Sequence, residues 1–145
     1  NDAGMFVTAW MGVLDITTGK VEFANAGHNP PLVKHADGTF EYLKSKPGFV
    51  LAGMEGIRYR KNELFLAPGD AIYLYTDGVT EATDADNALY GEKRLCTLLN
   101  GLHGLSGEDI CQAVKNDIDA FVGSAPQFDD ITMLYLKYNG GTKNA

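Results

Sequence analysis

The feature that most constrains the fold is a change of hydrophobic periodicity halfway along the chain. Up to about residue 76, apolar residues come in short runs rich in β-branched and aromatic side chains, which is typical of strands. Beyond it, leucines recur at near-helical spacing, a second apolar stripe follows, and one further strand-like run closes the pattern. The strands are expected at residues 6–14, 21–24, 32–34, 40–43, 59–66, 71–76 and 131–136, and the helices over residues 89–102 and 106–121.

This order of elements predicts an α+β sandwich whose mostly antiparallel sheet carries its helices on one side. Strands and helices do not alternate, which argues against a doubly wound fold. Asp37-Gly38 between two apolar runs predicts a tight hairpin. Ser106 followed by Asp109 resembles a capping box and predicts the start of the second helix.

Composition and charge exclude several functional classes. The chain has 145 residues, enough for one domain, with 12 Lys and Arg against 19 Asp and Glu, giving a net charge of −7. This balance argues against nucleic-acid binding and against a polybasic membrane-surface module. No apolar run reaches the roughly 18 residues of a membrane span. Cys96 and Cys111 lie among apolar residues, which favours buried, reduced thiols in a cytoplasmic protein over a disulfide.

Two segments place carboxylates where a strand meets a loop. Asp77 follows a strongly apolar strand and stands beside Gly78, which permits a close backbone approach or a positive φ. Asp129 and Asp130 directly precede the last strand. Each segment alone is most often a turn or a solvated loop. Together, at the rim of one sheet, they predict a site for Mg²⁺ or Mn²⁺, because these ions prefer carboxylate oxygens.

Other chemistries lack support in the sequence. His28, His35 and His103 are scattered, and no serine stands in a nucleophile-elbow setting, which argues against a Ser-His-Asp triad. No glycine-rich phosphate loop of either common type occurs. No cluster of His and Cys has the spacing of a zinc site.

Five segments occur in an order that points to a known family. They are residues 5–9 (MFVTA), 23–32 (FANAGHNPPL), 67–70 (APGD), 75–82 (YTDGVTEA) and 128–132 (FDDIT). In this the chain resembles the bacterial SpoIIE/RsbU-like serine phosphatases of the metal-dependent PPM (type 2C-like) family. The resemblance implies an α-β-β-α sandwich of two mostly antiparallel sheets with a binuclear Mn²⁺ or Mg²⁺ site at one end. It also implies hydrolysis of phosphoserine or phosphothreonine on a partner protein, commonly a STAS-domain anti-anti-sigma factor.

The resemblance assigns roles residue by residue. Asp77 and Asp129 match the metal-binding aspartates, which act through a water held by the metals. Gly78 and Asp130 stand next to them as supporting positions. His28 and Asn29 are placed on the substrate side, with the alternative that His28 only orders the loop of residues 27–31.

The family's early metal-binding motif has no match in the chain and is expected upstream of Met5. The resemblance therefore implies that residues 1–138 are the final three-fifths of a catalytic domain without its N-terminal strands, followed by a flexible tail at 139–145. Such a piece is expected to be inactive or nearly so, and its exposed strand edges to pair with another chain. The alternative is a non-catalytic phosphatase-fold module that binds a partner. Retention of both Asp77 and Asp129 favours catalysis.

Overall fold

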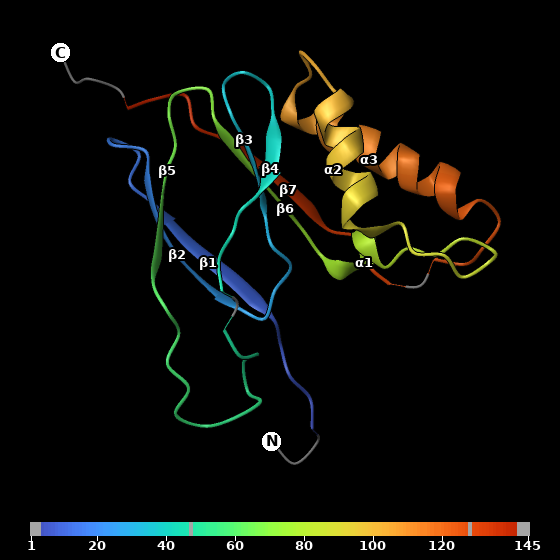
Figure 1. Ribbon diagram of the computed structural model, residues 1–145, viewed down its shortest axis with the longest axis horizontal. Coiled ribbons are helices and arrows are strands. Elements are labelled where there is room, and N and C mark those ends of the chain that lie inside the picture. Colours follow the sequence, from blue (N-terminus) through green and yellow to red (C-terminus); the bar gives the residue numbers. More distant parts are fainter. Residues whose placement is uncertain (1–3, 47, 128, 142–145) are drawn as a thin grey trace.

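Two antiparallel sheets stack face to face, and helices cover the outer side of one of them (Figure 1). The computed structural model describes residues 4–46, 48–127 and 129–141. The first sheet has the strand order β1-β2-β5, with β1 at Ala9–Leu14, β2 at Lys20–Ala26 and β5 at Asn62–Phe65. The second has the order β4-β3-β6-β7, with β3 at Leu32–Lys34, β4 at Phe40–Tyr42, β6 at Ala71–Tyr75 and β7 at Met133–Lys137.

Two hydrophobic clusters hold three layers together. The cluster between the sheets comprises Val21, Phe23, Val33, Leu66, Ile72 and Tyr138. The other joins the four-stranded sheet to helices α1 (Asp77–Thr80), α2 (Gly91–Gly101) and α3 (Gly107–Val122). The outer face of the three-stranded sheet instead carries the exposed side chains of Met11, Val13 and Phe65. The two antiparallel sheets of the expected α-β-β-α sandwich are confirmed. Among the described residues, helices form one of its two helical layers, on the four-stranded sheet.

Local signals in the sequence account for most of the elements. The hairpin at Asp37-Gly38 joins β3 to β4, with Gly38 at a φ of 96°. The Ser106 hydroxyl accepts a hydrogen bond from the Asp109 backbone N–H at 3.1 Å and caps α3. Leu89, expected within the first long helix, instead precedes it and is 62% exposed. Residues 77–80 form a short helix rather than a loop.

The helical layer is tied together by one charged cluster. Arg94 on α2 donates to both carboxylate oxygens of Asp117 on α3, at 2.9 and 3.0 Å, and the Tyr90 hydroxyl donates to the same carboxylate at 2.7 Å. The guanidinium also stacks over the rings of Tyr90 and Phe121. Hydrogen bonding from Arg94 and Tyr90 lowers the pKa of Asp117. The stability from this contact is therefore present above the ordinary carboxyl pKa and is lost as the pH falls through the lowered one.

The thiols of Cys96 and Cys111 are both free and only half-buried, rather than fully buried as their apolar neighbours suggest. Burial raises the pKa of Cys111 and keeps this thiol protonated. Among the described residues, no helix has the length and apolar character required to cross a bilayer.

The helix-side core should respond strongly to truncation. Ile118 on α3 is 1% exposed, so Ile118→Ala removes buried methyl and methylene groups and leaves a cavity. We expect the free energy of unfolding to fall by about 2–5 kcal/mol in a denaturant titration. Leu89→Ala, at a position that is 62% exposed, is the matched control and should change it by less than about 0.5 kcal/mol.

Candidate functional site

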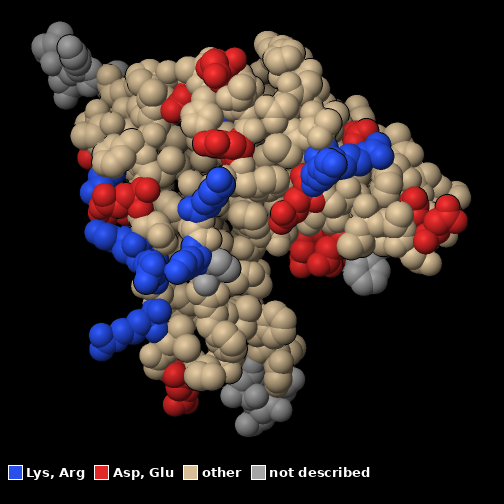
Figure 2. Space-filling model, in the orientation of Figure 1, with Lys and Arg blue, Asp and Glu red and all other residues tan. Residues whose placement is uncertain are grey.

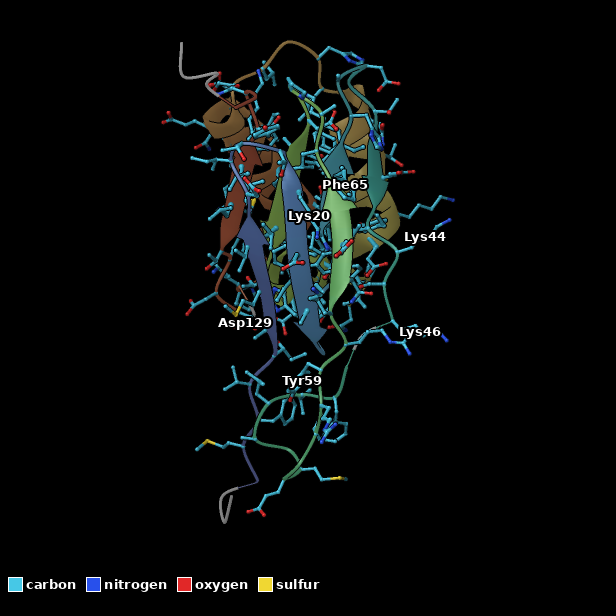
Figure 3. The ribbon with its side chains drawn as sticks, turned by 90° about the vertical axis from the view of Figure 1, so that its left-hand side faces the viewer. Lys20, Lys44, Lys46, Tyr59, Phe65 and Asp129 are labelled. Carbon is cyan, nitrogen blue, oxygen red and sulfur yellow. The ribbon has the colours of Figure 1, made fainter. Side chains whose placement is uncertain are left out.

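The two acidic segments lie at the same end of the four-stranded sheet. Strands β6 and β7 are antiparallel neighbours, with Tyr75 paired to Met133. Asp77 follows the last residue of β6 closely, and Asp129 and Asp130 shortly precede β7, so all three carboxylates lie beyond the same strand ends. All three are exposed, and Asp129 lies near the lower end of the strands in Figure 3. The two acidic segments therefore lie at one rim of the sheet, as the sequence predicts.

Thr76 fastens the two acidic segments to each other. Its backbone N–H donates to the Thr132 carbonyl at 3.0 Å, and its hydroxyl donates to the Asp130 carbonyl at 3.1 Å. The same hydroxyl accepts from the Thr132 backbone N–H, also at 3.1 Å. These three hydrogen bonds continue the β6–β7 pairing past the end of the ladder. They fix the segment that carries Asp77 against the segment that carries Asp129.

Gly78 allows the two segments to touch. A Cβ atom built on it would lie 2.3 Å from the Asp130 carbonyl oxygen and 3.4 Å from the Asp129 carbonyl carbon. Such a distance is impossible for any side chain. Because Gly78 has the helical backbone of α1, the close approach, rather than a positive φ, requires glycine at this position.

The carboxylates themselves remain largely open. One oxygen of Asp129 accepts the Asp130 backbone N–H at 2.7 Å, and the Gln127 side-chain amide donates to the Asp129 carbonyl at 2.8 Å. Within the described ranges, no side chain or backbone group donates to the carboxylate of Asp77. Exposed carboxylates that keep at least one oxygen without an internal partner are suitable ligands for a hard divalent cation.

The ligand set formed by these residues is partial. Asp77 and Asp129 supply two negative charges, whereas two divalent cations carry four positive ones. In the part of the chain that the structure describes, no group of three or more His, Cys, Asp or Glu side chains could hold a metal ion. The residues present fit Mg²⁺ or Mn²⁺ in their chemistry, and a complete site needs further oxygen ligands.

His28 and Asn29 lie in the loop between β2 and β3, at the same end of the four-stranded sheet as Asp77. The loop enters β3 at Leu32, which pairs with Tyr73, so it lies in the direction of the β6 C-terminus. The His28 main chain is held by the Asn25 side chain at 2.7 and 2.9 Å, and its ring bonds to the Thr8 hydroxyl at 3.0 Å. The Asn29 side-chain nitrogen is buried without a hydrogen-bond partner among the described residues.

The sequence did not single out Thr76 or Asn25, although each holds a segment at the end of the sandwich that carries the candidate site. Thr76 precedes Asp77 as the residue before a helix, a position where threonine is common, but its hydroxyl bonds across to another segment. Asn25 is a buried polar residue, 5% exposed, within an apolar strand. A buried amide in such a strand needs partners, and this is the one signal that could have identified it.

This architecture is that of the PP2C phosphatase domains. The structure superposes on the phosphatase domain of Bacillus subtilis SpoIIE with a TM-score of 0.72 at 16% identity, covering 93% of this chain and 58% of that one. On the RsbU and RsbW domains of Mycobacterium tuberculosis Rv1364c the TM-score is 0.65 at 26% identity, with 93% and 37% covered. The SpoIIE family model, described as stage II sporulation protein E, matches residues 1–139. The chain therefore belongs to the SpoIIE family.

Two curated relatives agree with this assignment. Protein IcfG of Synechocystis sp. is 33% identical over 138 residues, which are 95% of this chain and 22% of that protein. Phosphoserine phosphatase RsbU of Bacillus subtilis is 30% identical over 139 residues, with 94% and 40% covered. The chain thus spans less than half the length of these two relatives.

Replacing Gly78 should push the two acidic segments apart. In Gly78→Ala the new methyl group collides with backbone atoms of Asp130, so we expect a loss of about 1–3 kcal/mol in the free energy of unfolding. Gly101→Ala is the matched control, because no atom lies within 4 Å of that Cβ position in helix α2. It should leave stability unchanged or raise it by up to about 1 kcal/mol. Equal effects of the two changes would contradict the close-packing role.

Removing the Thr76 hydroxyl should loosen the junction between the segment that carries Asp77 and the segment that carries Asp129. Thr76→Val keeps the shape but leaves the Asp130 carbonyl and the Thr132 N–H without this partner, so we expect a loss of about 1 kcal/mol. Amide hydrogen exchange should show faster exchange at Thr132. In the control Thr97→Val, the lost hydrogen bond is to Lys93 within one turn of an exposed helix, and Thr132 exchange should not change.

Proposed function

We propose that this chain is the later part of the catalytic domain of a metal-dependent protein serine phosphatase. The observation that carries the proposal is the junction at Thr76 and Gly78, which holds Asp77 and Asp129 at one end of a PP2C-type sandwich. The similarity to a phosphoserine phosphatase, at 30% identity over 94% of the chain, supports the same reaction class. Residues 1–138 would belong to the catalytic domain and 139–145 to a flexible tail, most of which lies outside the described residues.

Asp77 and Asp129 would hold Mn²⁺ or Mg²⁺ through their open carboxylate oxygens. Two related structures support divalent-cation use, since the SpoIIE phosphatase domain was presoaked with Mn and RsbX was crystallised in complex with magnesium. When bound, a pair of such ions lowers the pKa of a water and neutralises phosphoryl oxygens for in-line attack on phosphorus. The missing ligands would come from sequence that precedes this chain in the protein.

The other residues of this end would position the metal ligands and the substrate. Thr76 and Gly78 keep the two ligand-bearing segments in contact, and Asp130 contributes its backbone carbonyl to that contact. His28 and Asn29 would shape the substrate side, where the buried, unpartnered nitrogen of Asn29 is a spare hydrogen-bond donor. The bonds from Asn25 and Thr8 would hold this loop in place.

The substrate would be a phosphoserine on a regulatory protein of the STAS type. Support comes from the similarity to RsbU and to a structure that contains both RsbU and RsbW domains. The free thiols of Cys96 and Cys111 fit a cytoplasmic location, where thiols stay reduced. Pairing of two chains through exposed strand edges remains part of this proposal.

Removing one proposed ligand should abolish turnover in the full-length protein. We expect Asp77→Asn to lower Mn²⁺-dependent release of phosphate from an aryl phosphate by at least about a hundredfold, because an amide is a weaker ligand for a hard cation. Asp129→Asn should have a similar effect. The control Asp86→Asn, on an exposed loop, should retain the activity of the unmodified protein.

Residues 1–145 alone should show almost no aryl phosphate hydrolysis at millimolar Mn²⁺, because the ligand set in the described part of the chain is partial. Turnover by this piece comparable with that of the full-length protein would contradict the proposed division of the site.

A non-catalytic module is the second candidate, favoured by the same partial ligand set. It would bind the phosphorylated partner without releasing phosphate. Full-length protein that binds a phosphoserine peptide but hydrolyses neither that peptide nor an aryl phosphate, with or without Mn²⁺, would establish this alternative.

A further inference from the structure

One short segment of this acidic chain is rich in positive charge. Residues 44–61 contain five of the 12 Lys and Arg residues but a single acidic residue, Glu55. In Figure 2 one group of Lys and Arg side chains runs along the left and lower-left side of the molecule, where β5 and the segment leading into it lie, and another group lies over the helices at the right. We call the group formed by Lys44, Lys46, Arg58 and Arg60 the basic edge.

The basic edge lies on two segments that adjoin edge strands of different sheets. Lys44 and Lys46 follow β4, the edge strand of the four-stranded sheet, and Arg58 and Arg60 precede β5, the edge strand of the three-stranded sheet. Figure 3 shows Lys44 and Lys46 projecting outward on the β5 side, away from the side where Asp129 lies. The basic edge and the carboxylates of the candidate site therefore occupy different sides of the sandwich.

These four cations are not neutralised within the described part of the chain. All four are exposed, and none has a carboxylate within ion-pair distance among the described residues. The neighbouring lysines behave differently, since Lys20 and Lys61 form ion pairs of 2.9–3.1 Å with Glu22 and Glu63. The charged side chains of β2 and β5 are thus all in ion pairs, whereas within the described ranges those of the basic edge are in none.

Close contacts fasten the basic edge to the loop at the candidate catalytic end. The Gly48 N–H donates to the Asn25 carbonyl at 2.7 Å, and a Cβ on Gly48 would lie 2.8 Å from that oxygen and 3.0 Å from the Tyr59 ring. Asn25 in turn holds the His28 main chain through its side-chain amide. Lys46 lies two residues before Gly48, and Arg58 and Arg60 flank Tyr59. The position of the cations is therefore coupled to the loop of residues 27–31.

We propose that the basic edge docks an acidic polypeptide segment of the protein substrate, while the site, on another side of the same end of the sandwich, processes the phosphoserine. This inference rests on the proposed function. Unpaired cations beside a catalytic end attract a segment of opposite charge and raise the encounter rate. A long polyanion such as nucleic acid would extend past the basic edge onto a chain of net charge −7 and be repelled there, whereas a short acidic segment would not.

The test measures binding separately from turnover. The probe is a fluorescein-labelled 12-residue peptide rich in Glu and without phosphate, and the readout is fluorescence anisotropy with the full-length protein at low salt. Lys44→Glu combined with Arg60→Glu should weaken binding by about tenfold or more, and added salt should weaken binding to the unmodified protein. The control, Lys93→Glu combined with Lys137→Glu, changes the net charge equally at exposed positions elsewhere and should bind as the unmodified protein does.

Equal binding by the two double variants would overturn the proposal, as would tighter binding of single-stranded DNA or of anionic phospholipid vesicles than of the acidic peptide. Aryl phosphate hydrolysis should be unchanged in Lys44→Glu/Arg60→Glu, which shows that the variant is folded. For a phosphoserine peptide flanked by Glu, the variant should raise KM and leave kcat unchanged, and replacement of the flanking Glu by Gln should remove the difference. If the unmodified full-length protein hydrolysed neither substrate, the proposed function would be rejected. The anisotropy measurement would still decide whether the basic edge binds an acidic segment.

Discussion

The rest of the structure depends on β6 being buried on both faces. Tyr73 and Tyr75 pack into the cluster beneath the helices, and Ile72 packs into the cluster between the two sheets. A strand that is apolar on both sides can only lie in the interior of a layered fold, flanked here by β3 and β7. Its C-terminal end is therefore a fixed point from which Asp77 emerges, and every other feature of the candidate site is placed relative to it.

The junction beside that strand end explains why a conformationally ordinary glycine matters. The Thr76 hydroxyl donates to the Asp130 carbonyl and accepts from the Thr132 N–H, so one short side chain binds the backbone of the other segment twice. Gly78 then brings the backbone of α1 into contact with Asp130. The main chains of Asp77, at the start of α1, and Asp129, in the loop before β7, gain a fixed spacing from this, while both side chains stay exposed.

The sequence predicted the strands, the hairpin at Asp37-Gly38 and the cap at Ser106 because these depend on local periodicity and turn chemistry. It also predicted that Asp77 and Asp129 share one rim, since strand direction determines this. It could not predict the hydrogen bonds of the Thr76 hydroxyl or the close contact of Gly78 with Asp130, because the partner residues lie more than 50 positions away in the sequence. Leu89 was misplaced for a related reason: near-helical spacing continues into a segment that pairs with Thr83 instead.

Two regions of this molecule carry exposed groups of opposite charge. The open carboxylates beyond β6 and before β7 can gather cations, while the unpaired Lys and Arg side chains around β4 and β5 can gather anions. Asn25 connects the two regions, because its carbonyl accepts from Gly48 and its side chain holds His28. A substrate with a phosphoserine and an acidic flank would need both regions at once, so its charge pattern, rather than the shape of a deep pocket, would set its orientation.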